Sequence, residues 1–312
     1  MNVFNSLEDL PDFHQTAITI GSFDGVHSAH EKILQKVKRV AAGGNCESIV
    51  ITFHPHPRLI LNPNDNSLKL LTTKEEKIFL LKQFDLNALV FVPFSKEFAN
   101  MSATEYIENF LLRYFHPKYI VIGYDHQFGK DRKGNIELLK QYAGKFNFEV
   151  IEIEKQVIDD ISISSTKIRK AIDNKDLYIA ERLLGHPYSI MGKVVRGKQI
   201  GRKIGFPTAN VQVTEKEKLL PPIGIYAAWA IVKDIKYGSM LYIGDRPTIK
   251  DDGKVSIEVN IFDFDKDIYD EQIRIELVEF IRDDQKFDNL DELKKALEKD
   301  KIRAQYYLNP PK

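Results

Sequence analysis

The sequence has little of several features that would place it in a specialised class of protein. It contains one cysteine, Cys46, in 312 residues, so no internal disulfide can form and a reducing compartment suits it. No run of about 18 apolar residues is present. The first residues also lack the basic and apolar segments of a secretion signal. These absences predict a cytoplasmic protein with no membrane partner.

The sequence also has no excess of charge of either sign. Lysine plus arginine and aspartate plus glutamate each number 45, so the formal net charge is zero. Without an overall positive field, no nucleic-acid partner is predicted, and any phosphate must be recognised locally. The hydrophobic content of 43% and the charged content of 29% are typical of a globular protein long enough for two domains.

Short apolar runs alternate with helical patterns in the first part of the chain, up to about Leu184. The runs begin at Ala17, Ser48, Ala88, Tyr119 and Phe148. Between them, Thr73 with Glu76 and Ser102 with Glu105 have the spacing of capping boxes that open helices. Alternating strands and helices predict an α/β domain over residues 1–185, in which helices cover both faces of a parallel sheet.

From about His186 the pattern changes to six successive strands. These are expected within residues 188–197, 206–213, 224–232, 237–244, 255–264 and 272–281. Similar lengths and antiparallel succession predict a small closed barrel over residues 186–312, because closure removes exposed sheet edges. One amphipathic helix, from Leu290 to Leu308, ends the chain, with Asp288 or Asn289 as its N-cap.

Two histidines follow the first predicted strand in the stretch TIGSFDGVHSAHEKIL, Thr19 to Leu34. His27 and His30 fall in the turn or in the first helical turn, on about the same face. Unpaired backbone N–H groups and the helix dipole make this position a natural anion site. The alternative is that both histidines are ordinary polar residues near a helix start.

Other polar stretches allow more than one interpretation. His54 and His56, in TFHPHPRLI, lack the cysteine or carboxylate partners of a zinc site, so zinc is not favoured. The stretch GYDHQFGKDRKGN, residues 123–135, follows the fourth strand and is either a surface turn or part of a ligand site. Hydroxyl residues in ISISSTKIRKAI, from Ile161, precede a basic helix and either cap it or bind phosphate.

The stretch VVRGKQIGRKIGFPTANV, residues 194–211, combines basic residues with glycines. Arg196, Lys198, Arg202 and Lys203 alternate with Gly197, Gly201 and Gly205, which predicts a loop able to wrap phosphates. Thr208 and Asn210 are two residues apart on the following strand, so their side chains share a face and could meet a Mg²⁺–phosphate group. Strand alternation alone predicts that Glu258 is a surface carboxylate.

Five ordered motifs make the whole chain recognisable. They are GSFDGVHSAH, ISSTKIR, GRKIGFPTAN with its PTAN core, IEVNIFDFDKDIY and IRDDQKF. Together they resemble the bacterial bifunctional riboflavin kinase/FAD synthetase family. The resemblance implies a Rossmann-like nucleotidyltransferase domain followed by a flavokinase barrel. It also implies ATP, riboflavin, FMN and FAD as substrates and products, with Mg²⁺ accompanying ATP.

For the adenylyltransferase, the resemblance implies that His27 and His30 bind the ATP phosphates and stabilise the charge that develops during transfer. It assigns further ATP contacts to Gly21, Phe23, Asp24, Ser165, Thr166 and Arg169. It places Asp125 and Phe128 on the flavin side. One departure from the pattern is Ala29, which stands where the signature has glycine.

For the kinase, the resemblance implies that Thr208 and Asn210 position Mg²⁺ and ATP. Gly197 and Arg202 belong to the loop that covers the nucleotide, and Arg282 belongs to the flavin-side loop. Glu258 becomes the general base for the riboflavin 5′-hydroxyl, which replaces its interpretation as a surface residue. Two alternatives stay open: a riboflavin kinase with an impaired adenylyltransferase domain, and a non-enzymatic flavin- or nucleotide-binding regulator.

Overall fold

The chain forms two compact units, Met1–Ser164 and Ser165–Lys312. The computed structural model describes residues 1–65, 67–153, 163–197, 200–245 and 255–309. Lys198, predicted to belong to the basic loop, lies outside the described residues.

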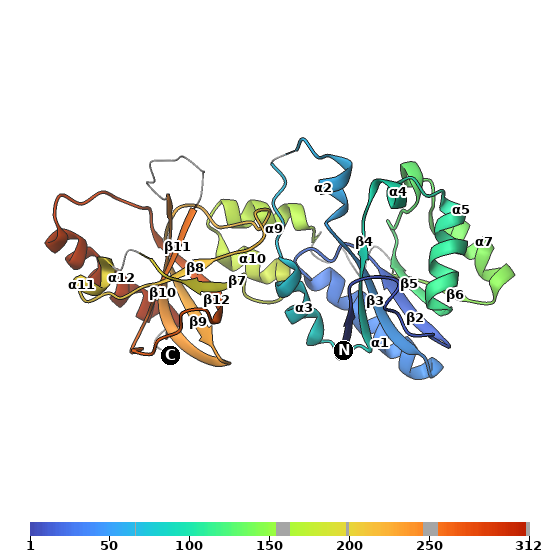
Figure 1. Ribbon diagram of the computed structural model, residues 1–312, viewed down its shortest axis with the longest axis horizontal. Coiled ribbons are helices and arrows are strands. Elements are labelled where there is room, and N and C mark those ends of the chain that lie inside the picture. The colour runs from blue at the N-terminus through green and yellow to red at the C-terminus, as the bar shows by residue number, and fades with distance from the viewer. Residues whose placement is uncertain (66, 154–162, 198–199, 246–254, 310–312) are drawn as a thin grey trace. The chain divides into compact units, whose positions relative to one another are not determined.

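The first unit is built on a six-stranded parallel sheet (Figure 1). Its strands follow the order β1-β4-β3-β2-β5-β6. They are β1 (Asn2–Phe4), β2 (Thr16–Ile20), β3 (Glu47–His54), β4 (Ala88–Pro93), β5 (Pro117–Gly123) and β6 (Glu149–Ile153). The five predicted strands and their parallel pairing are confirmed, whereas the short strand β1 at the sheet edge was not predicted.

Helices cover both faces of this sheet, as predicted. They are α1 (Ser28–Gly44), α2 (Pro57–Leu61), α3 (Lys74–Lys82), α4 (Lys96–Ala99), α5 (Ala103–Glu105), α6 (Arg113–Phe115) and α7 (Ile136–Phe146). A π-helix, η1 (Tyr106–Leu112), joins α5 to α6, and a 3₁₀ turn, η2 (Lys130–Arg132), precedes α7. Both predicted capping boxes are present, at the start of α3 and of α5.

Alternate residues of each strand feed two separate hydrophobic cores. Ile18 of β2 packs in the core that also contains η1 and α7, whereas its neighbour Ala17 packs in the core under α1 and α3. This division follows from the strand period of two, because successive side chains point to opposite faces. The carboxyl ends of the strands are therefore held between two packed layers. The loop from β2 to α1 begins at one of these ends.

The second unit is a closed antiparallel barrel with the strand order β10-β11-β8-β7-β12-β9. Its strands are β7 (Ser189–Val195), β8 (Ala209–Gln212), β9 (Gly224–Val232), β10 (Ile235–Asp245), β11 (Val255–Ile261) and β12 (Gln272–Arg282). All six were predicted, and so was the closure. A short helix, α11 (Ile200–Lys203), lies between β7 and β8.

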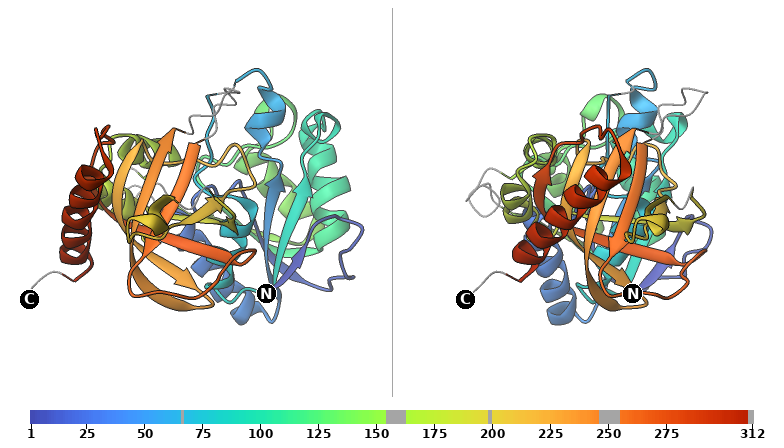
Figure 2. Two further views of the ribbon diagram at one scale, coloured as in Figure 1. Left: turned by 60° about the vertical axis from the view of Figure 1, so that its left-hand side comes forward. Right: turned by 90° about the vertical axis from the view of Figure 1, so that its left-hand side faces the viewer.

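The last helix, α12 (Leu290–Leu308), packs against the barrel strands β9, β10 and β12 (Figure 2). Its bounds agree with the sequence prediction. Asn289 is the N-cap, and its side chain accepts a hydrogen bond from the Glu292 N–H group at 2.9 Å. Ala304 and Leu308 pack in a core with Phe206 of the barrel unit.

Two helices precede the barrel and belong to the second compact unit. These are α9 (Ser165–Asp173) and α10 (Leu177–Leu184), and α10 contacts β12. The predicted boundary after residue 185 follows the change in sequence pattern, whereas the compact units divide after Ser164. Where the two functions divide stays a prediction.

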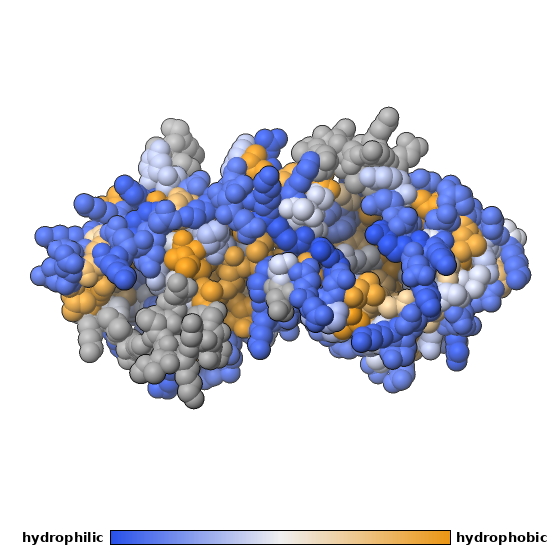
Figure 3. All heavy atoms as spheres, turned by 90° about the horizontal axis from the view of Figure 1, so that it is seen from above, coloured by the Kyte–Doolittle hydropathy of each residue, from blue (hydrophilic) through white to orange (hydrophobic). Residues whose placement is uncertain are grey.

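Polar residues cover much of the face seen in Figure 3, with apolar residues in small groups between them. Within the part of the chain that the structure describes, no helix is both long enough and apolar enough to cross a membrane.

Candidate active sites

The loop between β2 and α1 has an unusual backbone. Phe23, Gly25 and Val26 have φ angles of 45°, 84° and 42°. Glycine adopts such angles freely, but a β-branched residue such as Val26 does so only under strain. Strain of this kind persists where the surrounding structure holds the chain, and it is concentrated at functional sites.

Buried hydrogen bonds hold this loop in place. The carboxylate of Asp24, which is 2% exposed, accepts hydrogen bonds from the N–H groups of Leu71 at 2.9 Å and Thr72 at 3.2 Å. The N–H group of Gly25 donates to the hydroxyl of Thr72 at 3.1 Å. Asp24 therefore fixes the shape of the loop, and its predicted place beside ATP stays a prediction.

The structure brings His27, His30 and Phe23 together at the start of α1. His27 is the N-cap residue, and its side chain does not cap the helix. The two imidazole rings stack, with centroids 3.7 Å apart and planes 13° from parallel, and the Phe23 ring lies 4.9 Å from His30. The N–H groups of the first helical turn begin at the same point, so an anion would meet both the helix dipole and the imidazoles.

The surroundings of His30 favour its neutral form. Burial lowers its pKa well below the ordinary value, and the nearby His27 and Lys77 lower it further. A neutral imidazole still donates one N–H group. The Nδ1 atom of His30 is buried and makes no hydrogen bond to the described residues. Next to it, Ala29 is 4% exposed, so its methyl group is covered by the protein's own atoms.

The residues predicted to contact flavin in this unit lie after β5. Asp125 is exposed in the turn. Phe128 is 6% exposed and stacks on Tyr106, with ring centroids 4.9 Å apart. Phe128 thus belongs to the hydrophobic core, and its contact with flavin stays a prediction. Sequence reasoning gave no role to His126, whose pKa is lowered to about 4 by burial, although Asp125 acts to raise it.

Three further residues with a predicted phosphate role begin α9. Ser165 and Arg169 are half-buried and Thr166 is exposed, while Ile168 between them is buried. These residues belong to the second compact unit, whereas His27 and His30 belong to the first. Their predicted contact with the same ATP molecule stays a prediction.

A carboxylate and two hydroxyls meet on the barrel. Glu258 of β11 lies directly opposite Asn210 of β8 in the sheet register. The Thr208 hydroxyl donates to Oε2 of Glu258 at 3.0 Å, and the Ser256 hydroxyl donates to Oε1 at 3.1 Å. Glu258 is half-buried, so it is not the exposed residue that strand alternation alone predicts. Thr208, Asn210 and Glu258 are thereby brought together, and their role in a kinase stays a prediction.

Gly197 lies against this cluster. A Cβ atom at Gly197 would come within 2.1 Å of the Nδ2 atom of Asn210, a distance that real Cβ atoms do not reach. Glycine lets the backbone pass this close to the Asn210 side chain, whereas any other residue would require the Asn210 side chain or the loop to shift. The glycine in the basic stretch is therefore explained by a close approach as well as by loop flexibility.

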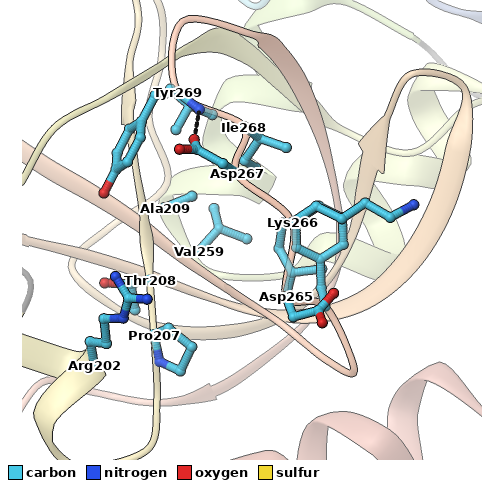
Figure 4. Close-up of a pocket in the computed structure, with 13 residues that line it drawn as sticks. Arg202, Pro207, Thr208, Ala209, Val259, Asp265, Lys266, Asp267, Ile268 and Tyr269 are labelled. Carbon is cyan, nitrogen blue, oxygen red and sulfur yellow. Dashed lines mark hydrogen bonds between the residues drawn. The ribbon is translucent and has the colours of Figure 1, made fainter.

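A cavity of about 400 Å³ opens on one side of Thr208 (Figure 4). It is lined by Arg202, Pro207, Thr208, Ala209, Val259 and residues 264–269, among others. Near its rim, the Arg196 guanidinium lies 5.0 Å from the centre of the Tyr269 ring. The charged residues that line the cavity are Arg202, Lys266, Asp265 and Asp267, and the guanidinium of Arg202 beside the Thr208 hydroxyl suits a phosphate group.

A second cavity of about 270 Å³ also has Thr208 in its wall. Its lining is mostly apolar and includes Phe206, Ile225, Met240, Leu241, Phe287, Leu293 and Leu297. Its polar lining residues are Thr208, Tyr242, Glu258, Asn260, Arg282, Asp284 and Gln285. An apolar pocket with a few fixed polar groups suits a flat aromatic ligand. Glu258 lines this cavity only, and it is hydrogen-bonded to Thr208, which lines both cavities.

Arg282 lines the apolar cavity, but its guanidinium is bound within the protein. Its Nε and Nη2 atoms donate to the carboxylate of Asp300 on α12, at 3.0 and 2.8 Å, and Nη1 donates to the Asp283 carbonyl at 2.9 Å. Arg282 thus lines the apolar cavity and is tied to α12, and its predicted place in the flavin-side loop stays a prediction.

Metal sites built from side chains alone are not apparent in the described parts of the chain, where no three His, Cys, Asp or Glu residues gather in a suitable group. His56 instead caps α2, with its Nδ1 atom accepting from the Arg58 N–H group at 3.2 Å. The Thr208 hydroxyl and the Asn210 amide provide the hard oxygen donors that Mg²⁺ accepts when phosphates supply the rest of its ligands. These residues therefore fit the predicted ion.

Comparison with known proteins finds a separate family model for each of two parts of the chain. A family model described as FAD synthetase matches residues 10–167, and one described as riboflavin kinase matches residues 184–308. The chain is 37% identical over 283 residues to a bifunctional riboflavin kinase/FMN adenylyltransferase of Listeria monocytogenes, covering 91% of this chain and 89% of that protein. The chain belongs to the bifunctional riboflavin kinase/FMN adenylyltransferase family.

Two further relatives extend the comparison. A bifunctional riboflavin kinase/FMN adenylyltransferase of Bacillus subtilis is 36% identical over 95% of this chain and 93% of its own length. Among solved structures, one titled as a macrolide-efflux protein from Streptococcus pneumoniae is 31% identical and covers 100% of both chains, with a TM-score of 0.85. The resemblance inferred from the five motifs is thereby confirmed for this riboflavin kinase/FMN adenylyltransferase family member.

Proposed function

We propose that this protein transfers the γ-phosphoryl group of ATP to riboflavin, giving FMN and ADP, and then transfers AMP from a second ATP to FMN, giving FAD and pyrophosphate. The observation that supports this most strongly is the position of Glu258. It lies in the wall of an apolar cavity and is bonded to Thr208, which borders that cavity and the nucleotide cavity alike.

In the kinase step, the apolar cavity holds the flavin ring system and directs the 5′-hydroxyl towards Glu258. The carboxylate accepts the hydroxyl proton as the oxygen attacks the γ-phosphorus, and the bond from that phosphorus to the β-phosphate oxygen breaks. Hydrogen bonds from Thr208 and Ser256 orient the carboxylate. Mg²⁺, bound with ATP, would neutralise charge on the phosphates, and Thr208 and Asn210 are the residues that would hold it. Gly197 and Arg202 enclose the nucleotide.

In the adenylyl transfer step, a phosphate oxygen of FMN attacks the α-phosphorus of ATP, and the bond to the β-phosphate oxygen breaks to release pyrophosphate. His27 and His30 hold the triphosphate through N–H groups placed in advance by the strained loop. The N–H groups at the start of α1 add to this attraction. Gly21, Phe23 and Asp24 shape the pocket.

One experiment tests both steps. The protein is incubated with riboflavin, ATP and Mg²⁺, and the flavins are separated by chromatography over time. We expect FMN first and FAD later. FMN without FAD would support a kinase with an impaired adenylyltransferase, and tight flavin binding without turnover would support a regulator. The lone thiol of Cys46 is in keeping with work in the reducing cytoplasm, which we propose as its location.

A further inference from the structure

Helix α3 carries a lysine inside the protein. Lys77 is 6% exposed, and its Nζ atom donates a hydrogen bond to the backbone carbonyl of Ser22 at 2.6 Å. A lysine side chain normally extends so that its ammonium group reaches water, because burial of a charge is costly. By contrast, Lys82, at the end of the same helix, is exposed. The position of Lys77 therefore needs an explanation beyond solubility.

The bond from Lys77 reaches the loop that leads to the two histidines. Ser22 precedes Phe23, the first of the residues with a positive φ angle. The same Ser22 carbonyl also accepts a hydrogen bond from the Thr52 hydroxyl at 3.2 Å. Because Asp24 binds the N–H groups of Leu71 and Thr72, the segment that ends in Lys77 holds this loop at two points.

Lys77 also places positive charge beside the histidines. After burial and the neighbouring His27, Lys77 is the third influence that lowers the pKa of His30. Such an interaction between an ammonium and an imidazole is stronger where both groups are buried than in bulk water. A buried cation next to neutral N–H donors and a helix N-terminus is the electrostatic complement of a polyanion such as a triphosphate.

We propose that Lys77 is a positioning residue for adenylyl transfer: it fixes the loop that carries His27 and His30 and supplies a buried positive charge for the ATP phosphates. This role rests on the proposed function of the first unit. No motif pointed to Lys77 in the sequence, because a lysine in the first turns of a helix with the sequence KEEK resembles a solvated residue.

Three substitutions separate the two parts of this role. Lys77→Met removes both the charge and the N–H donors of Nζ, whereas Lys77→Gln removes the charge and keeps an N–H donor on a shorter side chain. Thr52→Val removes the other donor to the Ser22 carbonyl and leaves the charge in place. Lys82→Met serves as the matched control, because it removes an exposed lysine from the same helix.

Adenylylation of added FMN is measured as kcat and KM for ATP, and formation of FMN from riboflavin by the same chain is the internal reference. We expect Lys77→Met to lower kcat/KM for ATP by about tenfold or more, as for loss of a charged hydrogen bond. Lys77→Arg restores part of this activity. The rate of FMN formation stays unchanged in every variant.

The pKa of His30 gives a readout that does not depend on turnover. NMR titration of labelled histidine, with the His30 signal identified by its loss in His30→Gln, follows the imidazole directly. Removing the positive charge in Lys77→Met and Lys77→Gln raises the pKa of His30, whereas Thr52→Val and Lys82→Met leave it unchanged. Thermal unfolding checks that each variant is folded; if Lys77→Met is not, Lys77→Gln decides the test.

The outcomes distinguish this inference from the function on which it rests. Wild-type activity and an unchanged His30 pKa in Lys77→Met and Lys77→Gln would overturn the role of Lys77 alone. If Thr52→Val and Lys77→Met lowered kcat/KM for ATP equally and left the pKa of His30 unchanged, Lys77 would only hold the loop. That result would overturn the proposed role of its positive charge. A wild-type protein that forms FMN but no FAD would overturn the proposed adenylyltransferase itself.

Discussion

Arg282 and Asp300 form a two-pronged ion pair that joins the end of β12 to the middle of α12. The side chains are 17% and 3% exposed, and the Nη2 atom of Arg282 lies 2.8 Å from Oδ2 of Asp300. The residues that follow Arg282 line the apolar cavity together with Leu293 and Leu297 of α12. The pair therefore holds the loop and the helix that form one wall of the proposed flavin site.

Asp300→Asn should weaken this wall. The neutral amide loses the charge attraction and leaves the Arg282 guanidinium without its counter-ion, which we expect to cost about 1–3 kcal/mol in the free energy of unfolding. The KM for riboflavin should rise several-fold while kcat changes less, because the altered wall binds substrate and does not transfer protons. Steady-state kinetics and thermal unfolding measure both effects. An unchanged KM would separate the ion pair from flavin binding.

Glu258→Gln should stop formation of FMN. The amide cannot accept the proton of the riboflavin 5′-hydroxyl, and loss of a general base lowers kcat by about 10²–10⁴-fold. Conversion of added FMN to FAD should be unaffected, because it uses the other unit. Ser256→Ala is the matched control: it removes only one hydrogen bond to the carboxylate and should cost far less. Kinase activity retained in Glu258→Gln would exclude Glu258 as the base.

His30→Ala should have the opposite effect. The substitution removes one of the two stacked imidazoles and with it an N–H donor to the triphosphate, so FAD formation from FMN should fall by about a hundredfold or more. FMN formation from riboflavin should continue at the normal rate. His56→Ala, which removes the side-chain cap of α2, provides a control in the same unit. FAD formed at the wild-type rate would contradict the assignment of His30.

Gly197→Ala should damage the kinase through Asn210. The new Cβ atom would lie 2.1 Å from Nδ2 of Asn210, so either the side chain or the loop must move. We expect a rise in the KM for ATP in the kinase reaction and no change in adenylylation of FMN. Gly43→Ala offers a comparison, because a Cβ atom there meets nothing within 4 Å and alanine favours the helix by about 1 kcal/mol. Normal kinase kinetics in Gly197→Ala would show that Asn210 tolerates displacement.

Much of the fold could be predicted because its patterns are strong and local. Short apolar runs predicted every strand of the described residues except β1, and Asp288 or Asn289 marked the start of the last helix. Strand β1 was not predicted because it has only three residues, none of them fully buried. A strand this short is defined by its pairing with β4, which is distant in the sequence.

The residues of the candidate sites were harder to predict from the sequence than the strands and helices. Thr208 and Asn210 could be placed on one strand face, but strand alternation put Glu258 on the surface, and only the register with β8 brings it opposite Asn210. Phe128 has the chemistry of a flavin contact, yet its ring packs on Tyr106 in the core. No pattern in the sequence marked Lys77 as a site residue, because its burial depends on the packing of α3 against the β2–α1 loop.

The position of α9 matters for any attempt to separate the chain into two fragments, one for each reaction. The match to FAD synthetase ends at residue 167, inside a helix that folds with the barrel. A fragment cut after Ser164 keeps the stacked histidines and discards Ser165, Thr166 and Arg169, which the family resemblance assigns to the same triphosphate. A fragment cut after residue 185 keeps them but removes α10 from β12. The first cut would therefore divide residues predicted to serve one reaction, and the second would remove from the barrel a helix that packs on it.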